Sequence, residues 1–272
     1  MLQPRSLLLA PRRPRCKRTF RGDNRTARRD VSANQDPDRA AQVADAYRRV
    51  VERVQAAALS AGRSADEVRI VAVTKTVSPY WIRAAHDAGA RLFGENRVQE
   101  AQEKIEGWRG LNPPLPAEWH LIGHLQSNKA RLAARLFDCV QSVDSVRLAR
   151  ELGRRAIELG RVLPVLLEVN IAGEASKSGF TPVGVADALG EITAVQGIDV
   201  RGLMTIAPID APGELARPWF ARLRGLRDRL RSESGFPGLT ELSMGMTNDF
   251  EAAIAEGSTM VRIGRAIFGE RG

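Results

Sequence analysis

Lys75 stands directly after a short apolar segment, where a charged side chain is unexpected unless it has a use. The segment runs from Ile70 to Thr74 and is rich in β-branched residues, so it predicts a buried strand. A lysine at the end of a strand is often only solvated or paired with a carboxylate. In an apolar pocket, or beside another cation, a lysine amine loses its proton more readily and can attack a carbonyl carbon. Lys75 is therefore a candidate for forming a Schiff base with an aldehyde.

Two glycines farther along the chain also follow apolar segments, in the ranges 243–247 and 262–266. Glycine allows backbone N–H groups to approach phosphate oxygens closely, and serine or threonine adds a hydroxyl donor. Each glycine could instead be an ordinary turn residue, and the arginine at 262 could either face a ligand or pair with a carboxylate. Together with the lysine, these segments suggest an aldehyde that carries a phosphate. The candidate residues in them are Ser243, Gly245, Arg262, Gly264 and Arg265.

Strand and helix patterns alternate along the rest of the chain. Apolar segments predict eight strands, at 68–74, 91–93, 119–122, 139–142, 163–169, 200–205, 241–244 and 260–263. Helical patterns fill the seven gaps between them, at 80–88, 98–107, 129–136, 145–159, 182–195, 215–232 and 250–256, and one more, at 40–61, precedes the first strand.

Eight strand–helix units predict a single (β/α)8 TIM-type barrel with an extra N-terminal helix. A doubly wound open sheet would show the same alternation, but it is disfavoured by the count of eight and by the lack of a GxGxxG turn after the first strand. Functional groups of such barrels lie at the carboxyl ends of the strands. Lys75 and both glycine segments fall at those ends, so the fold predicts that they meet at one mouth.

The first 35 residues differ in composition from the rest and predict a disordered Arg-rich extension before a barrel domain at 36–272. Residues 1–30 hold ten basic and two acidic side chains, net +8 of the chain's +9, so that the remainder carries only +1. Such a segment buries too little apolar surface to order itself. A nucleic-acid-binding arm and a targeting peptide are the alternatives. The nearly neutral barrel predicts no nucleic-acid partner.

The remaining composition bounds the class of protein. Cys16 and Cys139 are too few for a disulfide framework or a metal cluster, which is typical of a reducing compartment. No stretch approaches the ~20 apolar residues of a membrane helix. His120 and His124 are four residues apart, but they lie on a predicted strand and loop without the glutamate of a HExxH motif. We therefore expect a cytoplasmic protein with no membrane partner and no metal.

Several long segments of the chain resemble the pyridoxal phosphate homeostasis protein family, which has a barrel like the N-terminal domain of alanine racemase. The resemblance spans about residues 40 to 270. The matching segments are 71–76 (VAVTKT), 93–100 (FGENRVQE), 119–129 (WHLIGHLQSNK), 170–179 (NIAGEASKSG), 202–204 (GLM), 242–249 (LSMGMTND) and 261–269 (VRIGRAIFG).

The resemblance implies that the cofactor pyridoxal 5'-phosphate (PLP) is held covalently by Lys75 as an internal aldimine. It also implies that Arg262 faces the pyridine nitrogen, where a cation disfavours protonation and makes the ring a weaker electron sink. The residues implied to bind the phosphate are Ser243, Gly264 and the backbone of Arg265, and those implied to line the pocket are Asn96 and Met204. Arg97, His124 and Arg265 replace residues usual in the family, and the loss of a hydroxyl at 265 leaves backbone donation intact.

Two functions fit this resemblance. The first is a PLP carrier with no catalytic residue, which holds the aldehyde reversibly for PLP-requiring apoenzymes and is a monomer or a weak dimer. The second is a PLP-dependent amino-acid racemase. A racemase needs an acid or base on each face of the substrate carbanion, and in the related enzymes one of these is a tyrosine from a partner subunit's C-terminal domain. Tyr47 and Tyr80 are the chain's two tyrosines and neither is placed for that role, so the sequence favours the carrier.

Overall fold

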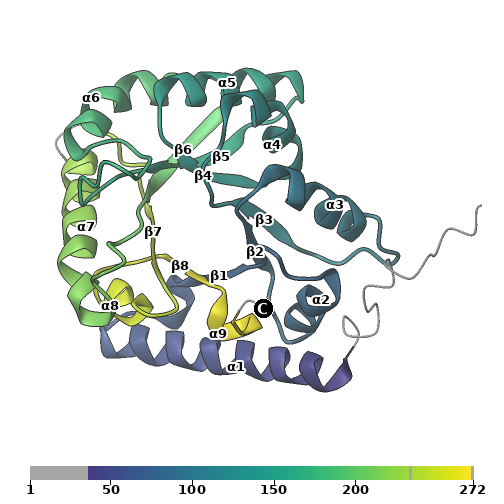
Figure 1. Ribbon diagram of the computed structural model, residues 1–272. Coiled ribbons are helices and arrows are strands. Elements are labelled where there is room, and N and C mark those ends of the chain that lie inside the picture. The colour runs from purple at the N-terminus through teal and green to yellow at the C-terminus, as the bar shows by residue number, and fades with distance from the viewer. Residues whose placement is uncertain (1–35, 233–234, 271–272) are drawn as a thin grey trace, which may run out of the picture.

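A closed barrel of eight parallel strands forms the centre of the computed structural model, which describes residues 36–232 and 235–270. Each strand pairs with the next along the chain, and β8 closes the ring by pairing with β1 (Figure 1). The strands are β1 Arg69–Val73, β2 Leu92–Glu95, β3 Glu118–Leu121, β4 Cys139–Val143, β5 Leu163–Glu168, β6 Ile198–Met204, β7 Glu241–Met246 and β8 Met260–Ile263. The predicted barrel is confirmed, and the extension at 1–35 lies outside the described residues.

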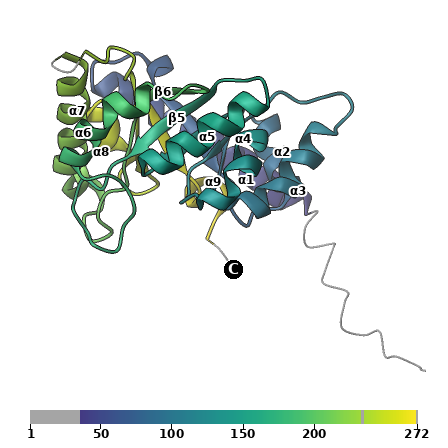
Figure 2. The same cartoon turned by 90° about the horizontal axis from the view of Figure 1, so that it is seen from above.

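Helices cover the outside of the barrel and follow the chain around it. They are α1 Pro37–Ser60, α2 Pro79–Asp87, α3 Val98–Arg109, α4 Ala130–Leu136, α5 Val146–Glu158, α6 Pro182–Thr193, α7 Arg217–Ser232, α8 Phe250–Ala255 and α9 Arg265–Phe268. Seen from above, α6, α7 and α8 group at one side, with α2 and α3 at the other (Figure 2). No helix in these described ranges is long and apolar enough to cross a membrane.

The helix before the first strand completes the outer layer. The helix after β8, α9, is only four residues long and was not predicted from the sequence. It leaves the outside of β8 and β1 to α1, which runs across the base of the view beside α2, α8 and α9 (Figure 1). Val43, Val50 and Val54 lie on one stripe of α1 and are buried, so this helix substitutes for a full-length eighth helix.

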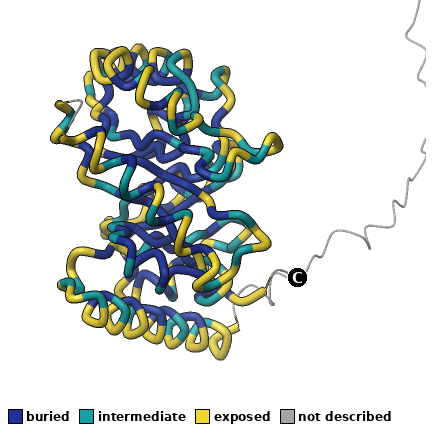
Figure 3. The backbone as a smooth tube through the Cα atoms, turned by 90° about the vertical axis from the view of Figure 1, so that its left-hand side faces the viewer, coloured by how far each residue is buried: buried dark blue, intermediate teal, exposed yellow. Residues whose placement is uncertain are grey.

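Apolar side chains fill both the space between strands and helices and most of the barrel interior. The strands lie deep in the molecule and the outer helix faces are exposed (Figure 3). The interior set consists of Val71, Leu92, Ile122, Cys139, Leu166, Met204 and Met260. Burial raises the pKa of the Cys139 thiol, so this cysteine is an apolar core residue.

Strand β2 extends two residues beyond the range predicted from the sequence. Gly94 belongs to the strand because it pairs with Val73 of β1 and His120 of β3, and a glycine is needed there because a Cβ would lie 2.7 Å from Val71 Cγ1. Glu95 follows in the strand although it is fully buried, since Thr74 Oγ1 and Lys104 Nζ donate hydrogen bonds to its carboxylate at 2.7 and 2.9 Å. A buried carboxylate is tolerated only with such partners, and the partners come from the residue after β1 and from α3.

Candidate functional site

A cavity of about 530 Å³ opens at the carboxyl ends of the strands. Its wall is formed by residues at the ends of β1, β7 and β8 and by the segments after β1, β2, β3, β5, β7 and β8, and the segment after β6 forms an apolar rim. The wall includes Lys75, Asn96, Lys177, Thr247, Asp249, Arg262, Gly264 and Arg265, and the rim is 206–209 with Ala211 and Pro212. The site thus lies where the barrel fold predicts.

Lys75 lies two residues beyond β1 in a turn that its neighbours hold in place. Thr76 has a φ of 62°, a backbone conformation that a β-branched residue rarely adopts. Its N–H donates a hydrogen bond to Glu100 Oε1, and the Thr74 carbonyl accepts one from Lys104 Nζ at 2.7 Å. Lys104 Nζ also lies 2.9 Å from Glu100 Oε1. These contacts from α3 fix the backbone on both sides of Lys75.

The same contacts connect the turn to the buried Glu95. Burial raises the pKa of Glu95, and the Lys104 ammonium and the Thr74 hydroxyl act in the opposite direction. Lys75 itself is partly buried, and it also lines a second cavity of about 510 Å³ toward α2 and α9. Its side chain therefore borders two spaces, and the cavity at the barrel mouth is the one that it shares with Arg262.

Arg262 reaches the cavity from β8 and is held inside the barrel. Its side chain is buried, Nη1 donates to Ser243 Oγ at 2.7 Å, and Nη2 donates to the Thr205 carbonyl at 2.8 Å. Burial lowers the pKa of Arg262 to about 10, while the carboxylates of Asp249 and Glu168 act to raise it. The guanidinium remains a cation at neutral pH and has a fixed orientation.

Asn96 supplies a buried acceptor without a protein partner. Its Oδ1 has no hydrogen-bond partner among the described residues, and the residue lines the same cavity as Lys75. A buried amide oxygen without a partner is costly, which indicates that a ligand group completes it. Gly123 allows this arrangement, because a Cβ there would lie 2.4 Å from the Asn96 carbonyl oxygen.

Five of the predicted site residues come together at the cavity: Lys75, Asn96, Arg262, Gly264 and Arg265. The other three, Ser243, Gly245 and Met204, do not line it. Met204 is fully buried among the apolar side chains of the barrel interior.

Ser243 and Gly245 lie within β7, below the mouth, and are buried among protein groups. The Ser243 hydroxyl is fully buried; it accepts from Arg262 and donates to Gln141 Oε1 at 2.6 Å. Gly245 has a φ of +91°, and a Cβ there would lie 2.5 Å from Ala253 Cβ on α8. A glycine is required at 245 by the packing of α8 on β7, independently of any ligand.

Four polar residues on the cavity were not predicted as site residues, namely Lys177, Thr247, Asn248 and Asp249. Thr247 follows β7 and is the hydroxyl residue of that segment that lines the cavity. Lys177 donates to Glu174 Oε1 at 2.6 Å and to the Ala207 carbonyl at 3.2 Å, so it ties the loop after β5 to the rim. Burial raises the pKa of Asp249. The motif segments 170–179 and 242–249 contained these residues, but sequence alone did not show which of them face the mouth.

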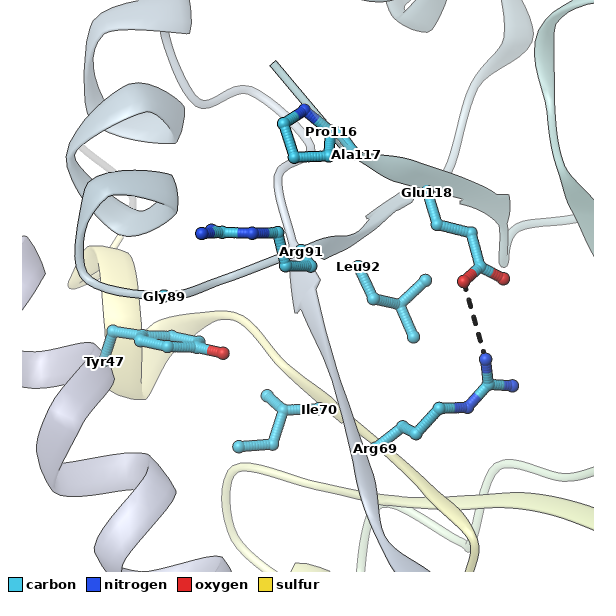
Figure 4. A pocket seen from close by; sticks show the side chains of 9 residues that line it. All are labelled: Tyr47, Arg69, Ile70, Gly89, Arg91, Leu92, Pro116, Ala117 and Glu118. Carbon is cyan, nitrogen blue, oxygen red and sulfur yellow. Dashed lines mark ion pairs between the residues drawn. The ribbon is translucent and has the colours of Figure 1, made fainter. Parts of the chain in front are cut away.

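A larger hollow, of about 650 Å³, lies at the opposite end of the barrel. Figure 4 shows it between the amino ends of β1, β2 and β3, with the Tyr47 ring at one side and an ion pair of Arg69 with Glu118 at the other. None of the predicted cofactor-binding residues lines it. Conserved chemistry in barrels of this kind belongs to the other end, so we assign the site to the smaller cavity.

His120 and His124, four residues apart in the sequence, lie in different surroundings. His120 is fully buried in β3, whereas the side chain of His124 is 54% exposed in the following loop and lies 3.0 Å from Asp144. Among the residues that the structure describes, no three His, Cys, Asp or Glu side chains gather as they would around a metal ion.

The alanine racemase N-terminal domain family matches residues 44–272, so the chain belongs to the class of alanine-racemase-like barrels, with the lysine, the arginine and the unpartnered Asn96 Oδ1 at its mouth. The chain is a member of the family of pyridoxal phosphate homeostasis proteins. Proteins of that name from Aquifex aeolicus and from Escherichia coli K12 are each 42% identical to it, over 82% of this chain and 96% and 94% of theirs.

Solved structures agree with this assignment. PipY of Synechococcus elongatus with PLP bound is 41% identical, with a TM-score of 0.69 over 75% of this chain and 93% of PipY. A protein from Bifidobacterium adolescentis is 43% identical, with a TM-score of 0.77 over 86% of this chain and 97% of its own. Alanine racemase of Clostridium difficile is 16% identical with a TM-score of 0.61, which shows the same fold only; this chain covers 53% of that enzyme.

Proposed function

We propose that this protein binds PLP through an imine with Lys75 and acts in PLP homeostasis as a reversible carrier. The observation that supports this most directly is the shared cavity of Lys75, Asn96 and Arg262. It offers an amine for the aldehyde, a buried acceptor without a partner, and a cation for the ring nitrogen. A PLP-bound relative with the same fold lends further support.

The cofactor would lie between the ends of β1 and β8. The Lys75 nitrogen bonds to the aldehyde carbon and water is released; hydrolysis reverses the step and frees the cofactor. The phosphate fits beside Gly264, where the backbone N–H groups of Gly264 and Arg265 and the hydroxyl of Thr247 are donors on the same cavity. In this arrangement Ser243 contributes by holding Arg262 in place.

These residues best support a protein that holds PLP without strong catalysis. A cation at the ring nitrogen weakens the electron sink that carbanion chemistry needs. Tyr47 points into the hollow at the far end of the barrel (Figure 4), and Tyr80 lies on α2 with 37% of its surface exposed. Neither tyrosine lines the cavity. We propose that the carrier works in the cytoplasm, as a monomer or weak dimer, and passes PLP to PLP-requiring apoenzymes.

The test is the visible absorbance of the protein titrated with PLP. An imine gives a yellow band, which we expect in the wild type and in Lys177→Ala, whose lost amine lies on the same cavity. Lys75→Ala should abolish the band completely. After borohydride reduction of the wild type, mass spectrometry should find the peptide that contains Lys75 heavier by the mass of the reduced cofactor.

A wild type that stays colourless at saturating PLP would refute the proposal, as would a band that survives in Lys75→Ala and disappears in Lys177→Ala. Sustained racemisation of an amino acid by the wild type, lost in Lys75→Ala, would favour the racemase instead of the carrier.

A further inference from the structure

Buried polar side chains cross the barrel interior from one end to the other. Such interiors are normally filled by layers of apolar side chains, and Met204 and Met260 are examples here. His120 on β3, Gln141 on β4 and Ser243 on β7 are polar and fully buried. Each buried polar group costs free energy unless it is hydrogen-bonded, so a set of three indicates a purpose for the set.

The hydrogen bonds of this set connect end to end. Arg262 Nη1 donates to Ser243 Oγ at 2.7 Å, and Ser243 Oγ donates to Gln141 Oε1 at 2.6 Å. Gln141 Nε2 lies 2.7 Å from His120 Nδ1, and His120 Nε2 lies 2.6 Å from Glu118 Oε1. Because an amide nitrogen only donates, His120 accepts at Nδ1 and carries its proton at Nε2. Every donor therefore points away from the cavity and toward Glu118.

The far end of this series of hydrogen bonds, at Glu118, lies in the hollow shown in Figure 4. Glu118 opens β3 with its side chain 44% exposed, and Arg69 Nη1 lies 3.5 Å away on β1. The hydrogen bond from His120 is the main reason why the pKa of Glu118 lies below its usual value. A negative charge at this end polarises each hydrogen bond above it in the same direction.

We propose that His120, Gln141 and Ser243 are positioning residues, a relay that holds the Arg262 guanidinium where the ring nitrogen of the cofactor meets it, with Glu118 as its anchor. Nη1 is fixed by the relay and Nη2 by the Thr205 carbonyl, so the plane of the guanidinium is set before any ligand binds. Such preorganisation strengthens binding by reducing the ordering that binding requires. The inference rests on the proposed function, because it assigns a role to the site described there.

The experiment compares two carboxylates at the far end of the barrel. Glu118 and Glu241 both pair with Arg69, at 3.5 and 3.2 Å, but only Glu118 bonds to His120. We expect Glu118→Ala to weaken the affinity for PLP about threefold and Gln141→Met about tenfold, and both to shift the absorbance maximum of the bound cofactor. Glu118→Gln, which keeps an acceptor for His120, should recover most of the affinity, and Glu241→Ala should match the wild type.

Pyridoxal, which lacks the phosphate, separates positioning from direct contact. If Ser243 acts through Arg262, Ser243→Ala weakens PLP and pyridoxal by the same factor, and combining it with Gln141→Met adds little because the two act as a unit. A loss confined to PLP would show that Ser243 contacts the phosphate and would overturn its place in the relay.

NMR of the ligand-free protein tests whether the relay holds Arg262, independently of PLP binding. Guanidinium NMR signals of Arg262, assigned by their loss in Arg262→Lys, should show restricted rotation in the wild type and in Glu241→Ala. Gln141→Met should release that rotation, while Leu166→Val, a substitution in the same interior that touches no relay bond, should not. Unchanged signals and unchanged PLP affinity in Gln141→Met would overturn the relay even if the wild type binds PLP. A wild type that does not bind PLP, but whose Arg262 signals are released in Gln141→Met, would refute the proposed function and leave the hold of the relay on Arg262 standing.

Discussion

At the scale of single residues, the turn around Lys75 is held by charged side chains of α3 that do not line the cavity at the barrel mouth. Thr74 and Thr76 flank the lysine, and each is tied to α3, through Lys104 and Glu100 respectively. The positive φ of Thr76 costs free energy, of order 1–3 kcal/mol in general, and the Glu100 carboxylate that accepts its N–H offsets that cost. The position of the Lys75 side chain thus depends on a glutamate in the next helix.

Glu100 should therefore make stability depend on pH. Burial raises the pKa of Glu100, but the hydrogen bonds from Lys104 and from the Thr76 N–H together lower it by more than burial raises it. The folded pKa therefore lies below the reference value of 4.5. The stability that the carboxylate contributes is present above 4.5 and is lost as the pH falls through the folded value. We expect Glu100→Gln to lower the free energy of unfolding by about 1 kcal/mol at pH 7 and by much less in acid.

Urea denaturation across this pH range measures the effect. Glu103→Gln is the matched control, because Glu103 lies on the same helix and is exposed. An equal loss in both variants, or a loss for Glu100→Gln that persists unchanged in acid, would contradict the role given to this carboxylate.

At the scale of elements, the two predicted phosphate glycines serve different purposes. Gly245 lets α8 pack on β7, since a Cβ would come within 2.5 Å of Ala253 Cβ and 3.0 Å of Phe250 Cα. Gly264 begins the turn into α9, and a Cβ there would meet Val73 Cβ at an ordinary 3.4 Å. The barrel needs the first glycine to assemble, whereas the second leaves space on the cavity.

Alanine substitutions should separate these two roles. Gly245→Ala combines a steric clash with a strained φ of +91°, so we expect it to destabilise the protein by about 2 kcal/mol or more. Gly264→Ala should keep the melting temperature within a few degrees while weakening PLP binding, because its methyl group lies where the phosphate is proposed. Thermal melts and PLP titrations of both variants provide the comparison, and an unaltered PLP affinity in Gly264→Ala would place the phosphate elsewhere.

At the scale of the whole molecule, the barrel begins with α1, which occupies the outer layer beside β8 and β1 in place of a full helix after β8 (Figure 1). We predict that deleting residues 1–33 leaves both folding and PLP binding intact, because α1 starts at Pro37 with Asp36 as its N-cap. Circular dichroism and the PLP titration test this. A deletion through Ser60 is the informative contrast, since it exposes Val50 and its buried neighbours and should abolish soluble protein.

The order of the strands and of the helices up to α8, the barrel, and the place of Lys75 just after β1 could be predicted from the sequence, because strand and helix periodicity and the position of a residue after a strand are local properties. The same holds for Arg262, Gly264 and Asn96, which follow or end strands.

Only the tertiary structure decided which strand residues face the cavity and which lie below it. Alternation along β7 shows that Ser243 points inward, but the stagger of neighbouring strands determines its depth, and at that depth it meets Arg262 and Gln141 rather than the mouth. The burial of Glu95 in β2 and the series of hydrogen bonds that ends at Glu118 likewise depend on partners from other segments of the chain. A local sequence pattern cannot predict which segments supply those partners.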